Sequence, residues 1–109
     1  MHELALTESV VEAVTERLPG ATITCVHLDV GALSGVVADS IQFCFELVTA
    51  GTSLEGARLE ISHTPGRGQC RSCGAEFEPD GPLVLCPCGS ADVAVLSGQE
   101  FTIASVQVA

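Results

Sequence analysis

Four cysteines in the second half of the chain have the types and spacing of a metal site. Cys70 and Cys73 form a C-x-x-C pair, and Cys86 and Cys88 follow after twelve further residues. Two close cysteine pairs separated by a short hairpin-like segment are typical of a structural four-thiolate zinc site, because Zn(II) takes four soft ligands in a tetrahedron. We therefore predict that Cys70, Cys73, Cys86 and Cys88 bind zinc.

The second cysteine pair departs from the usual spacing. The segment "CPCG" has one residue between its cysteines where two are usual, so the chelate is tighter and Cys88 is open to replacement. His63 is the nearest histidine and would be the substitute. Two other readings use the same sulfurs. A rubredoxin-like iron centre usually has aromatic surroundings, whereas this chain has four Phe and no Trp or Tyr. A C-x-x-C redox motif is expected near a βαβ unit, at the start of a helix.

The first residues, "MHE", form a second candidate metal site. The amine of Met1, the backbone amide of His2 and the His2 imidazole can close fused five- and six-membered chelate rings on one ion. The Glu3 amide can add another nitrogen. A near-planar, nitrogen-only set favours Ni(II) or Cu(II) over Zn(II), Mg(II) or Ca(II). The alternative is that His2 belongs to a terminal tail without function.

Hydrophobic periodicity predicts the elements that position these residues. Residues 4–18 and 38–51 have apolar side chains at helical spacing, and Pro19-Gly20 ends the first helix. Residues 22–31, 56–63 and 98–109 alternate as strands do. In the last strand we expect Phe101 and Ile103 on one face, and Val106 and Val108 on the other.

This order of elements predicts an α+β fold in which two helices pack on one face of a small three-stranded sheet. Residues 65–96 are rich in Gly, Pro and Cys and have little helix potential, so we expect an inserted zinc-ribbon-like lobe. The predicted domains are residues 1–64 with 97–109, and the insert 65–96. Cys25 and Cys44 are expected to be small buried hydrophobes. His27, within a strand, is expected to be structural.

Composition limits the function. The 14 acidic residues exceed the 4 basic ones and give a net charge of −10, which argues against nucleic acid or anionic lipid as a partner. We find no apolar run long enough to span a membrane and no secretory signal, so we expect a cytoplasmic protein in which cysteines bind metal rather than form disulfides. No catalytic triad or phosphate-binding glycine loop is present, so we expect a binding protein and not an enzyme.

The chain resembles the HypA/HybF family of hydrogenase-maturation nickel metallochaperones. The matching stretches are "MHELALTESVVEAV", "VGALSGVVADSIQFCFE", "GTSLEGARLEI", the cysteine pairs and "GQEFTIASVQV". They follow in consistent order from one end of the chain to the other, and the Met-His-Glu start is highly specific to the family.

The resemblance implies a nickel site at Met1, His2 and Glu3, and a structural zinc lobe. It implies delivery of Ni(II) to [NiFe]-hydrogenase large-subunit precursors together with a HypB-type GTPase, by a monomer or weak homodimer. Acidic residues near the second helix contribute to nickel chemistry or partner contact in the family, which makes Asp39 a further candidate; capping of that helix is the alternative. The competing function is a zinc-ribbon interaction module without specific nickel binding.

Overall fold

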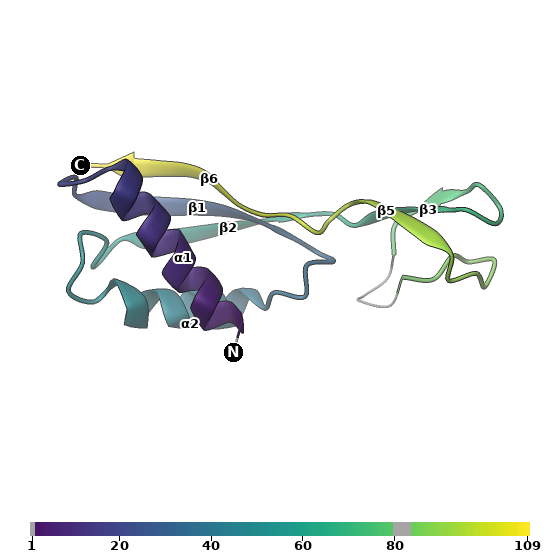
Figure 1. The fold of residues 1–109 in the computed structure, drawn as a ribbon, viewed down its shortest axis with the longest axis horizontal. Coiled ribbons are helices and arrows are strands. Elements are labelled where there is room, and N and C mark those ends of the chain that lie inside the picture. Colours follow the sequence, from purple (N-terminus) through teal and green to yellow (C-terminus); the bar gives the residue numbers. More distant parts are fainter. Residues whose placement is uncertain (1, 80–83) are drawn as a thin grey trace.

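The computed structural model describes residues 2–79 and 84–109. The elements are α1 (His2–Arg17), β1 (Ile23–Gly31), α2 (Ala38–Thr49), β2 (Arg58–Thr64), β3 (Arg67–Cys70), β4 (Glu76–Phe77), β5 (Val93–Ser97) and β6 (Phe101–Val108). The molecule is elongated, with extents of 53 × 23 × 17 Å, and its two sheets follow one another along the long axis (Figure 1).

The first sheet, together with α1 and α2, forms what we call the helical lobe. Its strand order is β2-β1-β6, with β1 parallel to β2 and antiparallel to β6. Parallel neighbours need a crossover connection, and α2 lies within that crossover between β1 and β2. This arrangement confirms the predicted α+β class.

One hydrophobic core holds the helical lobe together. Val26, Leu28 and Val30 alternate along β1 and are almost completely buried, so they share one face of the sheet. Val14 of α1 and Phe45 of α2 belong to the same buried cluster, which shows that both helices cover that face. Helix α1 begins at His2 rather than at residue 4, so His2 and Glu3 of the expected nickel site lie in its first turn.

The C-terminal strand corrects one expectation. Val106 pairs with Val26, and Phe101 pairs with Val30, so both lie on the core face and pack against the core. A register shift near Ala104 separates them, because Ser105 pairs with His27 while Ile103 pairs with Leu28. Such a bulge adds one residue to a strand and moves the following side chains to the other face. Strict alternation therefore placed Val106 on the wrong face.

The second sheet forms what we call the cysteine lobe, residues 67–97. Its strands have the order β4-β3-β5, and both pairings are antiparallel. The sequence predicted an insert here but none of its strands. The proposed limits of the insert, which include residues 80–83 outside the described part, stay a prediction. Among the described residues no helix is long and apolar enough to cross a membrane.

Three glycines bring the chain segments between the two lobes into close contact. A Cβ placed on Gly31 would lie 2.0 Å from the carbonyl oxygen of Gly98. A Cβ on Gly98 would lie 2.6 Å from the Cα of Gly66, and one on Gly66 would lie 2.6 Å from the Leu33 side chain. The Leu33 amide donates to the Gly98 carbonyl over 2.6 Å. Larger residues at these positions would push the segments apart.

Candidate metal centres

The four predicted zinc ligands lie together at the far end of the cysteine lobe. The sulfur atoms of Cys70, Cys73, Cys86 and Cys88 all lie within 4.8 Å of one another. The Sγ atoms of Cys73 and Cys86 are 3.5 Å apart, and those of Cys70 and Cys88 are 3.7 Å apart. A tetrahedral site with Zn–S bonds of about 2.3 Å has sulfur–sulfur distances of about 3.8 Å. The sulfur positions therefore fit a tetrahedral thiolate site.

Two tight turns deliver the sulfurs. The Gly74 amide donates to the Cys70 carbonyl over 2.9 Å, and the Gly89 amide donates to the Cys86 carbonyl over 2.8 Å. Both glycines have positive φ, 77° and 96°, a conformation that other residues rarely adopt. The second turn is one residue shorter than the first. This shortening accommodates "CPCG" without removing the Cys88 sulfur from the group.

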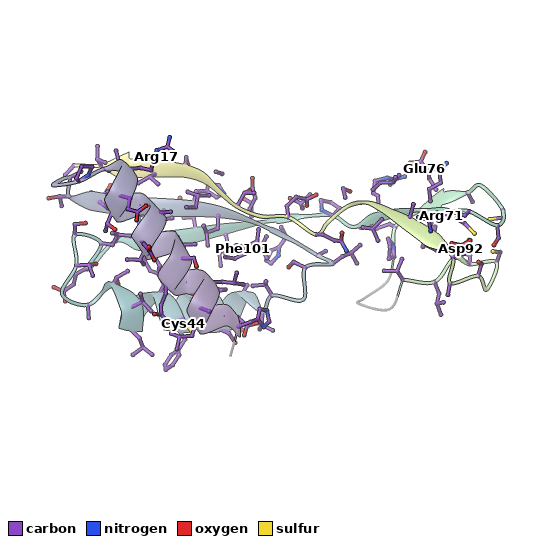
Figure 2. The ribbon with its side chains drawn as sticks, viewed as in Figure 1. Arg17, Cys44, Arg71, Glu76, Asp92 and Phe101 are labelled. Atoms are coloured by element: carbon purple, nitrogen blue, oxygen red, sulfur yellow. The ribbon has the colours of Figure 1, made fainter. Side chains whose placement is uncertain are left out.

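The surrounding chain holds these two turns together. The Arg71 guanidinium donates to the Asp92 carboxylate over 2.9 Å, and the Arg71 amide donates to the Asp92 carbonyl (Figure 2). The hydroxyls of Ser72 and Ser90 are 2.9 Å apart. The cysteine lobe therefore uses exposed polar contacts to fix the position of one turn against the other.

The surroundings of the four sulfurs shift the pKa values of Cys70 and Cys86 in opposite directions. A hydrogen bond from the Cys73 amide lowers the pKa of Cys70 to about 6, against the effect of burial, and the Ser72 amide contributes in the same direction. The Cys88 amide donates to Cys86, but burial and the neighbouring sulfurs raise the pKa of Cys86 to about 12. Sulfurs this close cannot all ionise unless a cation balances their charge. A thiophilic divalent ion would supply that balance.

His63 lies apart from the sulfur group. It is an exposed residue of β2 and is paired with Val30 of β1 in the first sheet. The part of the chain that the structure describes contains one group of three or more metal-ligating side chains, and Cys88 belongs to it while His63 does not. The geometry therefore favours the short cysteine pair over a histidine substitute.

His2 and Glu3 lie side by side in the first turn of α1, while Met1 lies outside the described residues. The His2 side chain is 58% exposed, and its Nε2 atom is 3.3 Å from the Glu3 carboxylate. Glu3 is buried against the loop before α2, where its carboxylate accepts a hydrogen bond of 3.4 Å from the Val37 amide. The two residues thus differ: the imidazole faces solvent, and the carboxylate is held by the fold.

These contacts set the charge of Glu3. Burial by itself would raise the pKa of this carboxyl. Hydrogen bonds from the backbone N–H groups of Val37 and Glu3, followed by the charge of His2, outweigh burial and hold the pKa below its usual value. The carboxylate therefore stays ionised at neutral pH.

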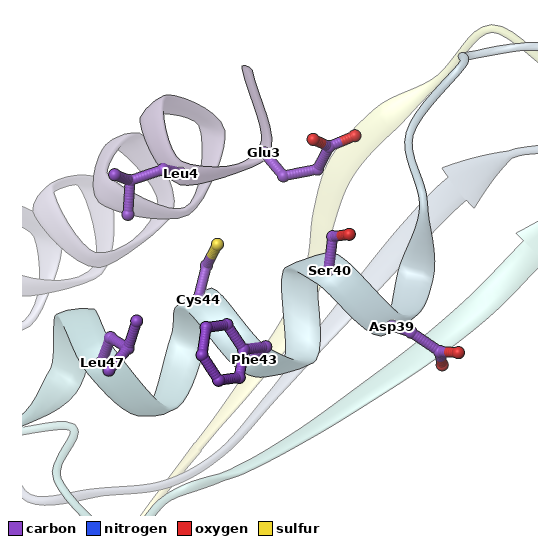
Figure 3. Close-up of a pocket in the computed structure, with 7 residues that line it drawn as sticks. All are labelled: Glu3, Leu4, Asp39, Ser40, Phe43, Cys44 and Leu47. Atoms are coloured by element: carbon purple, nitrogen blue, oxygen red, sulfur yellow. The ribbon is translucent and has the colours of Figure 1, made fainter. Parts of the chain in front are cut away.

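Asp39 lies near this site without capping its helix. The N-cap of α2 is Val37, and no side chain caps it. The exposed Asp39 lines a groove together with Glu3 and Cys44 (Figure 3). Cys44 is half-buried in that groove, so the expectation of a buried core residue was wrong. The contact between Glu3 and Val37 gave no sequence signal, because it joins a side chain to a backbone amide 34 residues away.

Cys25 is buried as expected, and the expected structural role of His27 stays a prediction. Cys25 is buried, and its thiol donates to the Glu60 carboxylate over 3.3 Å. Burial is the main cause that raises the pKa of Cys25, and the hydrogen bond to Glu60 raises it further. His27 is half-buried in β1, with its Nε2 atom 2.6 Å from the Ser62 hydroxyl. Neither residue joins a metal-ligating group among the described side chains.

Comparisons with known proteins cover nearly the whole chain. A family model described as "Hydrogenase/urease nickel incorporation, metallochaperone, hypA" matches residues 1–108. The Hydrogenase maturation factor HypA of Geobacter metallireducens is 48% identical over 109 residues, covering 99% of each chain. That of Nostoc punctiforme is 44% identical over 108 residues, covering 99% of this chain and 96% of the relative.

Solved structures share the fold at lower identity. The solution structure of the Ni metallochaperone HypA from Helicobacter pylori has a TM-score of 0.64 at 20% identity, covering 97% of this chain and 96% of that one. Another solution structure of a HypA protein has a TM-score of 0.67 at 22% identity, covering 100% and 97%. With the family match and relatives above 40% identity, these likenesses lead to one conclusion: the chain belongs to the HypA family of hydrogenase/urease nickel-incorporation metallochaperones.

Proposed function

We propose that the protein binds Ni(II) through Met1, His2 and Glu3 and delivers it to a [NiFe]-hydrogenase large-subunit precursor, together with a HypB-type GTPase. The observation that carries this proposal is the exposed His2 imidazole in the first turn of α1, beside the fixed Glu3 carboxylate. The protein acts as a cytoplasmic carrier rather than an enzyme, and its chemistry is ligand exchange.

The start of a helix suits the proposed nitrogen ligands. The first four N–H groups of an α-helix have no acceptor within the helix. Nickel can therefore replace the amide protons of His2 and Glu3 without breaking a hydrogen bond between turns of the helix, although the Glu3 amide would give up its bond to its own carboxylate; the imidazole and the Met1 amine complete the chelate. Because the imidazole is exposed, an acceptor protein can reach the metal and take it.

Charge at this end of the molecule also supports a cation. The N-terminus of a helix carries a partial positive charge, which by itself disfavours a metal ion. Glu3 supplies a compensating carboxylate beside His2, and no Arg is among the described residues that line the adjoining groove. Glu3 therefore contributes through its backbone nitrogen and through its negative charge.

The second metal in this proposal is a resident Zn(II) bound by Cys70, Cys73, Cys86 and Cys88. Four thiolates leave no open coordination position, so this zinc holds the cysteine lobe in its fold and takes no direct part in nickel exchange. The two tight turns and the sulfur separations support this assignment.

The decisive test is to move the terminal amine. Adding one glycine before Met1 leaves His2 and Glu3 intact but converts the Met1 amine into an amide. We expect this extended protein, and separately His2→Ala, to lose the native nickel complex, because the fused chelate needs both the amine and the imidazole. Calorimetric nickel titration and the nickel absorption spectrum measure the loss.

Zinc content and the far-ultraviolet circular dichroism of both variants should match the starting protein. Nickel affinity of the starting protein should fall with decreasing pH, because protons compete for its nitrogen ligands. If the extended protein binds nickel with unchanged affinity and spectrum, the amine is not a ligand and the proposed chelate is wrong.

A further inference from the structure

A groove next to the proposed nickel site shares Glu3 with it and extends beyond it along α2. It has a volume of about 460 Å³ and lies between the start of α1 and one side of α2. Glu3 and Leu4 line it from α1, and Asp39, Ser40, Phe43, Cys44 and Leu47 line it from α2 (Figure 3). Glu3 therefore belongs both to this groove and to the N-terminal site.

Large apolar side chains form one rim of the groove. Phe43 is 65% exposed and Leu47 is 59% exposed, and their spacing of four residues places them on one face of α2. Ile41 and Phe45, on the other side of the same helix, fill the core. The exposed pair thus adds nothing to the core, and neighbouring apolar side chains left exposed in this way mark interaction surfaces.

The charges around the groove identify the kind of partner. Glu3 and Asp39 are the charged residues that line it, and the exposed Glu46 lies three residues beyond Phe43 on α2. A second copy of the chain would bring another net charge of −10 and be repelled. Nucleic acid and anionic lipid are disfavoured for the same reason. A polypeptide with apolar side chains flanked by Arg or Lys complements both the apolar rim and the carboxylates.

We propose that this groove, which we call the α1–α2 groove, docks the nickel-accepting protein through an apolar segment flanked by basic residues. The inference rests on the proposed function, because the occupant is assigned from Glu3, which lines the groove and also belongs to the proposed nickel site. A segment seated against Phe43 and Leu47 lies next to the N-terminal chelate, so the groove serves the protein that receives the metal. Asp39 steers that segment, and the two apolar side chains retain it.

The test uses the full chain and the purified hydrogenase large-subunit precursor as probe. We expect Phe43→Ser/Leu47→Ser to weaken binding of this precursor by about tenfold or more, since aromatic and aliphatic anchors dominate interfaces. Asp39→Lys should weaken binding less and should reduce its dependence on salt concentration. Calorimetry or biolayer interferometry at low and high salt measures both effects.

The matched control is Val108→Ser, which removes a half-exposed apolar side chain from β6 of the same lobe. It should leave precursor binding unchanged. Phe43→Leu should keep most of the affinity of the starting protein, because it keeps an apolar side chain at this position. Since Phe43 and Leu47 are outside the core, the double variant should keep its melting temperature and its nickel affinity.

Two outcomes would overturn the proposal. One is unchanged precursor affinity in Phe43→Ser/Leu47→Ser. The other is concentration-dependent self-association of the starting protein that this variant abolishes while precursor binding persists, which would make a second copy the occupant. The proposed nickel site can fail independently of the groove. If the starting protein binds no nickel but the double variant loses precursor binding, the chelate is wrong and the docking surface is still supported.

Discussion

The two lobes of the molecule are stabilised in different ways. Among the residues that the structure describes, the helical lobe buries a continuous cluster of eleven hydrophobic residues, none of them between residues 65 and 97. In the cysteine lobe, the buried side chains among the described residues are those of Cys70 and Cys86, two of the four cysteines. A lobe of this size whose described residues form no apolar core needs another source of folding free energy, and we expect the proposed zinc to supply it. On this proposal one lobe folds by excluding water, and the other by binding an ion.

The largest effect that would test this contrast is loss of the metal. We expect Cys73→Ala to release zinc and unfold the cysteine lobe, because structural zinc contributes folding free energy directly, on the order of 10 kcal/mol. Backbone amides of β3 and β5 should then exchange rapidly with solvent while those of β1 stay protected. Metal analysis and hydrogen exchange measure the two results. The control is His63→Ala, which should retain zinc; zinc loss there would return the histidine to the ligand set.

An intermediate effect should appear when a side chain in the core of the helical lobe is truncated. Ile41 is completely buried between α2 and the sheet, so Ile41→Ala should lower the free energy of unfolding by about 2–5 kcal/mol. Zinc content should stay at the level of the starting protein, because the sulfurs lie in the other lobe. Urea denaturation followed by circular dichroism measures the first result. Parallel loss of zinc would show that the cysteine lobe depends on this core.

The smallest effect concerns Glu3 at the edge of the helical lobe. Its pKa lies below the usual value of 4.5, so the carboxylate stabilises the fold above about pH 4.5. That contribution is lost as the pH falls through the lower pKa of the folded state. We expect Glu3→Gln to be slightly less stable than the starting protein at neutral pH and equally stable at low pH. Urea midpoints across this range measure the difference, and a difference that persists at low pH would contradict the assignment to charge.

The sequence predicted those parts of the fold that depend on local pattern. Helical spacing predicted the helix over residues 38–51 that appears as α2, and alternation predicted the strand over residues 22–31 that appears as β1. The cysteine spacing identified the sulfur group, including Cys88 despite its short pair. Each of these signals lies within a few residues of chain, where side-chain periodicity or turn chemistry determines the structure.

The missing parts depend on contacts between distant residues. The register shift near Ala104 results from pairing with β1 and leaves no mark in the alternation of β6. The strands of the cysteine lobe are short, with 4, 2 and 5 residues, and β3 pairs with β5, which lies far from it in the sequence. Cys44 satisfies helical spacing for the core, but its side chain faces α1. Helical spacing alone does not determine whether a half-buried side chain contacts the core or the neighbouring helix. The packing of the two helices determines it.

The order of strands in the first sheet links the two lobes energetically. β2 and β6 flank β1 on opposite sides, and the connection between them, residues 65–100, is the cysteine lobe with its neighbouring segments. If this connection is a flexible loop, pairing β6 with β1 must first close about 36 residues; if zinc folds residues 67–97 into a rigid unit, the flexible part shrinks to about 5. Each doubling of loop length costs about 0.6 kcal/mol of closure entropy, so the difference is about 1.7 kcal/mol. The proposed zinc would therefore favour the last strand of a sheet that it does not contact, and loading of the metal before β6 pairs would speed the completion of the helical lobe.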